Sequence, residues 1–143
     1  MYQAVNPGKN GFIPAPPMKL QPDKSSAPLV RAYSPEWLQI DDLRFTQSVV
    51  VSSLPGHAPQ AWAPQSIDDL AAEHLAALAT SGAELVILGT GQRLRFPPPA
   101  WLQPFARERV GLESMDTAAA CRTYNILASE GRKVLAALLL DPL

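Results

Sequence analysis

The chain has 143 residues, enough for one domain with its own hydrophobic core. Its net charge of −1, from 12 basic and 13 acidic side chains, lacks the positive field of a general nucleic-acid binder, so we expect no nucleic-acid partner. A single cysteine excludes an internal disulfide framework and a cysteine-rich zinc site, and with only two histidines beside it we expect neither a metal nor a cofactor.

Residues 1–28 are predicted to form a flexible, proline-rich tail, and residues 29–143 a single α/β domain. The prolines of the tail remove amide donors and disfavour helix. Met18 opens a plainer run, MKLQPDK. We therefore expect the 17 residues upstream of it to be dispensable for folding, or to lie before the natural start.

The residues from Leu29 to Ser53 favour β-structure. Short apolar runs alternate there with turn residues such as Ser34–Pro35 and Asp41–Asp42. A β-branched run of three valines, Val49 to Val51, follows. This pattern predicts strands in antiparallel pairs.

The clearest amphipathic helix is predicted over Ser66 to Thr80. Ser66 followed by Asp69 is a weak capping-box pattern, and Gly82 suits the end of the helix. The apolar run Leu85 to Leu88 comes next and is consistent with a short buried strand.

A short helix, Ala100 to Arg107, and a short strand, Val110 to Leu112, are predicted after the proline triplet at 97–99. Asp116 is then a plausible N-cap for a helix of about 14 residues, and Gly131 suits the left-handed residue that ends it.

The run Val134 to Leu140 contains no polar residue. Seven residues are too few to cross a bilayer, which takes about 20, so the run predicts a strand that is buried on both faces. The alternation of strands and helices after residue 84 indicates a largely parallel sheet.

Two segments of the sequence are specific when they occur together. They contain Gly89-Thr90-Gly91, Phe96-Pro97, Glu113, Met115, Thr117, Ala119 and the run Arg122-Thr123-Tyr124-Asn125-x-Leu127-x-x-Glu130-Gly131-Arg132. On these residues the chain resembles the small Mth-type domains of unknown function, the family that includes the mitochondrial NADH:ubiquinone oxidoreductase (complex I) assembly factor 3. The resemblance covers roughly Leu29 to Leu140.

The resemblance implies a three-layer α/β sandwich with a mixed, partly parallel central sheet and additional N-terminal β-hairpins. It also implies protein partners, since the eukaryotic members assist the assembly of a respiratory complex, and it carries over no catalytic residues. The first 28 residues contain Asp23, many prolines and few arginines, unlike a mitochondrial transit peptide. We therefore expect a bacterial-type member in the cytoplasm.

The turn Gly89-Thr90-Gly91 has two interpretations. Glycines after a strand let backbone amides approach a phosphate, but the third glycine of G-x-G-x-x-G is replaced by Leu94, and no helix opens at once. A tight structural turn is therefore favoured over an anion cradle. If the turn does bind a ligand, Arg122 and Asn125 are predicted to face the same cleft.

The sequence shows no catalytic constellation. Cys121 lies among alanines and is predicted to be a buried packing residue rather than a nucleophile. We therefore expect a non-catalytic interaction domain with an unknown protein partner, one that assists the assembly of a respiratory complex or of another protein complex. The alternative is a binder or enzyme for a small anionic ligand or nucleotide, with its site at Gly89, Thr90 and Gly91.

Overall fold

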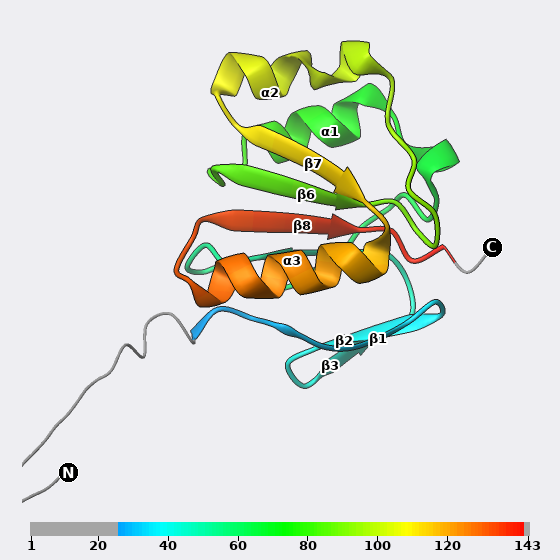
Figure 1. The fold of residues 1–143 in the computed structure, drawn as a ribbon, viewed down its shortest axis with the longest axis vertical. Coiled ribbons are helices and arrows are strands. Elements are labelled where there is room, and N and C mark those ends of the chain that lie inside the picture. Colours follow the sequence, from blue (N-terminus) through cyan, green and yellow to red (C-terminus); the bar gives the residue numbers. More distant parts are fainter. Residues whose placement is uncertain (1–25, 142–143) are drawn as a thin grey trace, which may run out of the picture.

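The structure is a computed structural model that describes residues 26–141. Within this range the chain forms a five-stranded sheet, a separate three-stranded sheet, and helices on both faces of the larger sheet (Figure 1). The strands are β1 (Val30–Ser34), β2 (Trp37–Ile40), β3 (Leu43–Phe45), β4 (Val49–Ser52), β5 (Gln60–Ala61), β6 (Leu85–Gly89), β7 (Gly111–Met115) and β8 (Val134–Leu138). The helices are α1 (Ala72–Ala79), α2 (Gln103–Glu108) and α3 (Thr117–Ser129), with 3₁₀ helices η2 (Ile67–Asp69) and η3 (Pro99–Leu102).

The five-stranded sheet is mixed, as predicted. Its strand order is β5-β4-β8-β6-β7, and β6 pairs in parallel with both β8 and β7. β4 runs antiparallel to β8 and to β5. The three strands β1, β2 and β3 form the antiparallel small sheet that the turn residues predicted. The prediction of a three-layer α/β fold with N-terminal hairpins is confirmed.

Strand β8 occupies the centre of the sheet and is buried on both faces. From Val134 to Leu140 no residue is more than 4% exposed. Val134, Ala136 and Leu138 pack on the side of α3, whereas Leu135 and Ala137 pack on the side of α1 and α2. The all-apolar composition follows from this position, because neither face of the strand meets water.

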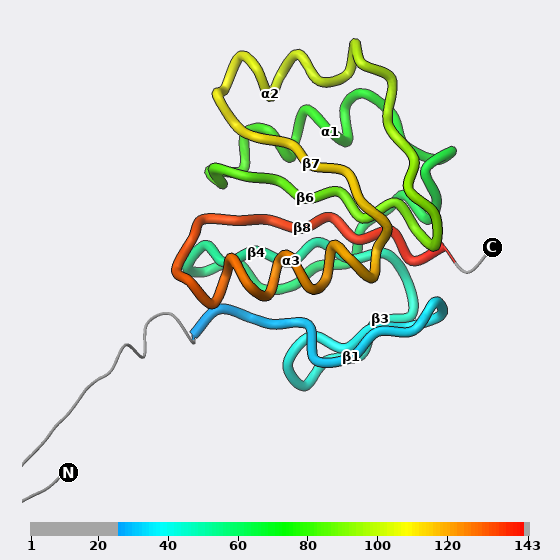
Figure 2. The backbone as a smooth tube through the Cα atoms, viewed as in Figure 1, coloured from blue at the N-terminus to red at the C-terminus, as the bar shows by residue number. Residues whose placement is uncertain are grey.

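Helix α3 lies along one face of the sheet, with β1 beside it (Figure 2). Ala120 and Ala128 are buried there, and their small side chains let the helix approach the strands closely. The Asp116 carboxylate accepts a hydrogen bond of 2.9 Å from the amide of Ala119, and Gly131 adopts φ +81°. Both predicted ends of this helix are confirmed.

The predicted helix from Ser66 to Thr80 is wrong in its first half. The chain forms η2, becomes extended at Leu70 (ψ 143°), and only then enters α1. Ser66 makes no capping bond; instead the amide of Ala71 donates to Nδ1 of His74 at 2.9 Å. Ile67 and Leu70 are both buried in the core, although the helix is interrupted at Leu70.

The predicted tail lies outside the described residues, except for residues 26–28. Ala27 packs against the core, and the Pro28 carbonyl accepts a hydrogen bond of 2.8 Å from the Tyr124 hydroxyl. None of the helices between residues 26 and 141 combines the length and the apolar character that a membrane span requires.

Candidate functional site

The turn Gly89-Thr90-Gly91 begins at the end of β6 and packs against the first turn of α3. A Cβ atom on Gly89 would lie 3.0 Å from Oγ1 and 3.1 Å from Cα of Thr117, so the strand and the helix are in backbone contact there. Gly91 adopts φ +97°, a conformation that side chains rarely tolerate. The two glycines are therefore explained by close packing and by the path of the chain.

The amides of the turn already have protein acceptors. The Thr90 amide donates to the carbonyl of Met115 at 2.9 Å, and the Gly91 amide donates to Oγ1 of Thr117 at 2.8 Å. A phosphate cradle needs such amides to point at the anion. In this conformation Thr90 and Gly91 offer none.

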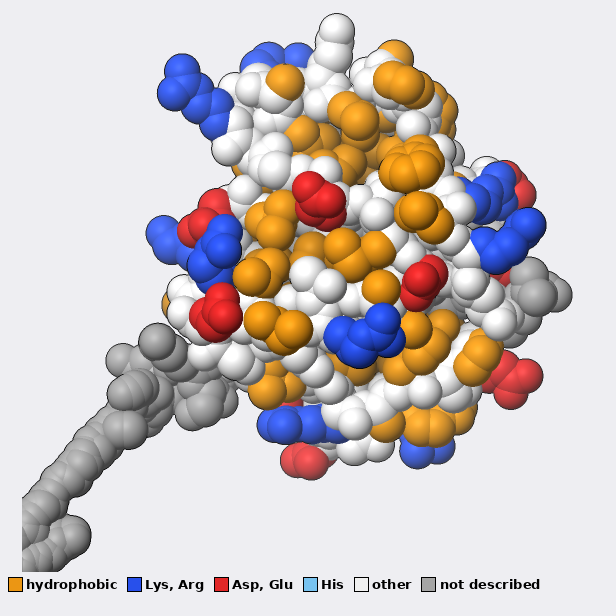
Figure 3. Space-filling model, in the orientation of Figure 1, with side chains coloured by type: hydrophobic (Ala, Val, Ile, Leu, Met, Phe, Trp, Pro, Cys, Tyr) orange, Lys and Arg blue, Asp and Glu red, His pale blue; other side chains and the backbone are white. Residues whose placement is uncertain are grey.

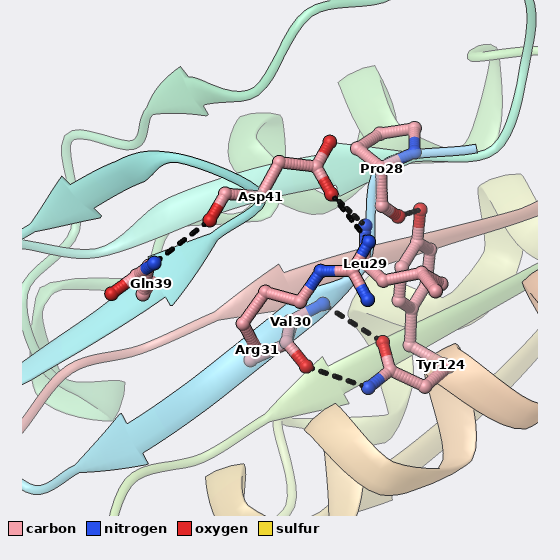
Figure 4. A network of polar contacts seen from close by, with 8 residues as sticks. Pro28, Leu29, Val30, Arg31, Gln39, Asp41 and Tyr124 are labelled. Atoms are coloured by element: carbon pink, nitrogen blue, oxygen red, sulfur yellow. Dashed lines mark hydrogen bonds and ion pairs between the residues drawn. The ribbon is translucent and has the colours of Figure 1, made fainter. Parts of the chain in front are cut away.

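Arg122 and Asn125 both lie on α3, but Asn125 is occupied elsewhere. Its side-chain oxygen accepts from the Val30 amide at 2.9 Å, and its side-chain nitrogen donates to the Val30 carbonyl at 2.8 Å. Figure 4 labels Val30 and draws both bonds as dashed lines. Asn125 is eight residues beyond Thr117, which corresponds to about 12 Å along the helix. The predicted set is thus divided: the turn meets Thr117, whereas Asn125 holds β1, and the Arg122 side chain is exposed.

The hydroxyl of Thr90 shapes the segment that follows the turn. It donates to the Arg93 carbonyl at 2.6 Å and accepts from the Arg95 amide at 3.1 Å. Pro97 is buried, so the chain is fixed on both sides of Phe96. The Phe96 side chain is left 71% exposed.

A hollow of about 240 Å³ lies beside Phe96. Its border carries an ion pair of 2.9 Å between Arg95 and Asp68. We call Phe96 together with this hollow the Phe96 surface. The residues that line the hollow are Ile67, Asp68, Leu70, Arg95, Phe96, Pro97, Pro98 and Trp101.

The Phe96 surface was not predicted from the sequence, although the Phe96-Pro97 pair was noted. A phenylalanine is usually buried, so the residue type gives no sign that this side chain points outward. The available signal was the proline triplet after it, which limits how the chain can turn the ring inward.

A second group of exposed apolar side chains lies elsewhere. Figure 3 shows hydrophobic side chains gathered over β7, α2 and the neighbouring part of α3, with only a few charged side chains among them.

Every pKa shift that is resolved in the described part of the chain is an increase caused mainly by burial. Burial raises the pKa of Cys121 to about 12, although the neighbouring Arg122 charge opposes this. Burial also raises the pKa of Tyr33. Among residues 26–141, no three histidine, cysteine, aspartate or glutamate side chains come together in a group that could hold a metal ion.

The thiol of Cys121, the single cysteine of the chain, is expected to be inert in the native protein. Its raised pKa lowers the thiolate fraction at pH 8 by a factor on the order of 1,000 relative to the unfolded chain. The thiolate is the reactive form, so the native thiol should react slowly. Labelling with a chromogenic disulfide should be slow in buffer and complete at once in concentrated urea. Equal rates in the two solvents would contradict the buried position.

The comparisons with known proteins identify a family. A family model described as a protein of unknown function (DUF498/DUF598) matches residues 30–139. The chain is 31% identical over 71 residues to the 13 kDa major membrane protein of Francisella tularensis subsp. holarctica, covering 48% of this chain and 58% of that protein. It is 30% identical over 125 residues to NADH dehydrogenase (ubiquinone) 1 alpha subcomplex assembly factor 3 of Danio rerio, covering 86% of this chain and 70% of that protein. The chain thus spans less than two thirds of the Francisella relative.

Solved bacterial structures have the same fold. A crystal structure of a Bordetella parapertussis protein is 35% identical, with a TM-score of 0.73, over 80% of this chain and 97% of that one. A solution structure from Bordetella pertussis, described as a Mth938-like domain, is 29% identical, with a TM-score of 0.70, over 86% of this chain and 90% of that one. The resemblance found in the sequence is confirmed. The chain belongs to the DUF498/DUF598 family of proteins of unknown function, the Mth938-like domains, which also includes proteins named complex I assembly factor 3.

Proposed function

We propose that this chain is a non-catalytic interaction domain that assists the assembly of a protein complex, with a respiratory complex as the first candidate, and that it acts in the bacterial cytoplasm. The observation that carries the proposal is the Phe96 surface. A large aromatic ring stands 71% exposed beside a hollow whose lining combines apolar side chains with the charged Asp68 and Arg95. Aromatic side chains are typical anchors of protein–protein contacts, in which polar groups surround the apolar centre.

The energetics favour a protein partner. Covering an exposed phenylalanine contributes about 1.5–3 kcal/mol, which the free domain does not gain. The backbone on both sides of the ring is held in place, because Thr90 bonds to the backbone at Arg93 and Arg95 and Pro97 is buried. Binding therefore orders the side-chain torsions of Phe96 but little additional backbone.

The relatives support the same proposal, since assembly factor 3 proteins of several vertebrates are among them. A small anionic ligand at Gly89, Thr90 and Gly91 remains the alternative. It has less support, because the amides of Thr90 and Gly91 already donate to protein acceptors.

Affinity capture of the full chain from a native bacterial lysate tests the proposal. The variant Phe96→Ser should lose a partner that the wild-type chain retains in near-stoichiometric amount. Leu43→Ser is the matched control, since Leu43 is 53% exposed on β3 in the other sheet and its replacement should leave capture unchanged. Respiratory-complex subunits among the lost proteins would identify the candidate complex.

Two outcomes would overturn the proposal. One is that Phe96→Ser captures the same proteins in the same amounts as the wild-type chain. The other is that no protein is captured reproducibly while a small metabolite purifies with the chain, which would favour the anionic-ligand alternative.

A further inference from the structure

We propose that the Phe96 surface also joins two copies of this chain, with Phe96 of each copy seated in the hollow of the other. The inference rests on the proposed function, because both assign protein contacts to the same surface. It commits to a second copy of this chain as the occupant. Three features of the surface carry it: its shape, its charges and its rigidity.

The shape of the surface is self-complementary. In a two-fold symmetric dimer both copies use the same patch, so the patch must present a projection and a matching hollow side by side. Phe96 is the projection, and it also borders the hollow. An apolar cavity of about 150 Å³ holds a benzene molecule, so the hollow of about 240 Å³ is large enough for a phenyl ring. Ile67, Leu70 and Trp101 supply apolar wall.

The charges of the surface are also self-complementary. Arg95 and Asp68 lie at the border of the hollow, with side chains 42% and 77% exposed. Within one chain these two side chains pair with each other. The proposed two-fold axis passes beside this pair, so that Arg95 of each copy also faces Asp68 of the other. A patch of one sign would repel its own copy, whereas this pair of opposite charges does not.

The segment is prepared for the contact before it forms. Thr90 bonds to the backbone at Arg93 and Arg95, and Pro97 is buried, so Phe96 needs no large rearrangement to insert. The patch is small, however, and small interfaces are weak and transient. We expect a dissociation constant in the micromolar range or above, which lets a different protein partner displace the second copy.

Sedimentation equilibrium of the full chain, from low micromolar to near-millimolar concentration, measures the association. The wild-type chain should pass from monomer to dimer over this range. Phe96→Ser should weaken association about 30-fold or more, as loss of a central anchor does. Leu43→Ser, which removes a different exposed hydrophobic side chain from β3, should associate like the wild-type chain.

A charge exchange tests the geometry. Asp68→Arg and Arg95→Asp should each weaken association when studied alone, because each places like charges across the two-fold axis. An equimolar mixture of the two variants should recover it, since opposite charges then meet at both contacts. Adding Phe96→Ser to both members should abolish the recovery, which separates seating of the ring from general attraction. Circular dichroism should show native folding for every variant, because Asp68 and Arg95 are exposed.

Monomeric wild-type chain at every concentration would overturn the inference, as would a Phe96→Ser dimer of wild-type strength or a mixture no stronger than its members. If the chain is monomeric but capture from lysate still depends on Phe96, the proposed function stands and the dimer alone fails. If the dimer depends on Phe96 but no other protein is captured, the proposed function fails and the dimer stands.

Discussion

Replacing Thr117 by valine is expected to lower the free energy of unfolding by about 2–4 kcal/mol, although valine has nearly the same shape. Thr117 is fully buried, and its hydroxyl donates to the Leu139 carbonyl at 2.7 Å while it accepts from the Gly91 amide at 2.8 Å. Valine leaves both backbone groups unpaired away from water, and each such group costs about 1–2 kcal/mol. Urea denaturation followed by circular dichroism measures the loss as a lower midpoint at unchanged slope.

The matched control is Thr117→Ser. Serine keeps the hydroxyl and removes only a buried methyl group, so the loss should be about 1 kcal/mol. If valine and serine proved equally stable, the hydroxyl would not be the link between β8, the turn and α3.

Replacing Tyr124 by alanine is expected to cost about 3–5 kcal/mol, the largest effect of any single change considered. Tyr124 is fully buried and is among the largest such side chains, lying in the core between α3 and the two sheets. Alanine leaves a cavity that the surrounding strands cannot close. Thermal unfolding should show the loss as a fall in Tm, and a variant as stable as the wild-type chain would contradict the packing.

Tyr124→Phe separates the ring from its hydroxyl. It removes only the bond to the Pro28 carbonyl and should cost about 1 kcal/mol near pH 7.

Burial, and to a lesser extent the Asp41 charge, raise the pKa of Tyr124. A raised pKa means that the folded state holds this proton more tightly than the unfolded state. The stability that it contributes is therefore complete below about pH 10 and is lost as the pH rises further. Above that pH the wild-type chain should lose stability faster than Tyr124→Phe, and parallel pH profiles would contradict this.

The elements that could be predicted are those with dense local signals. The N-cap Asp116, the alanines of α3, Gly131 and the apolar run of β8 all lie within one stretch, and each agrees with the others. The region around Ser66 could not be predicted correctly, because the spacing of Ile67 and Leu70 also fits the apolar stripe of one continuous helix. What decides its path includes Gln65, whose side chain accepts from the Ser48 amide 17 residues earlier.

The candidate site was predictable only in part, for the same reason. The position of the turn Gly89-Thr90-Gly91 after a buried strand was correct, and so was its tight geometry. The partner of the Gly91 amide, however, is Thr117, which lies 26 residues further on. The outward direction of Phe96 depends on the Thr90 hydroxyl and on buried Pro97, and no local rule joins those residues to an exposed ring.

The two hydrogen bonds between Asn125 and Val30 have a consequence for how the small sheet is seated. Within its own sheet β1 is aligned by the backbone of β2, whereas against α3 it is aligned by one carboxamide, with the Tyr124 bond to Pro28 just before the strand. A slip of one residue would carry Arg31 into the buried place of Val30 and turn the inward side chains of the strand to water. Side chains on one helix thus help to select which residues of β1 face the interior.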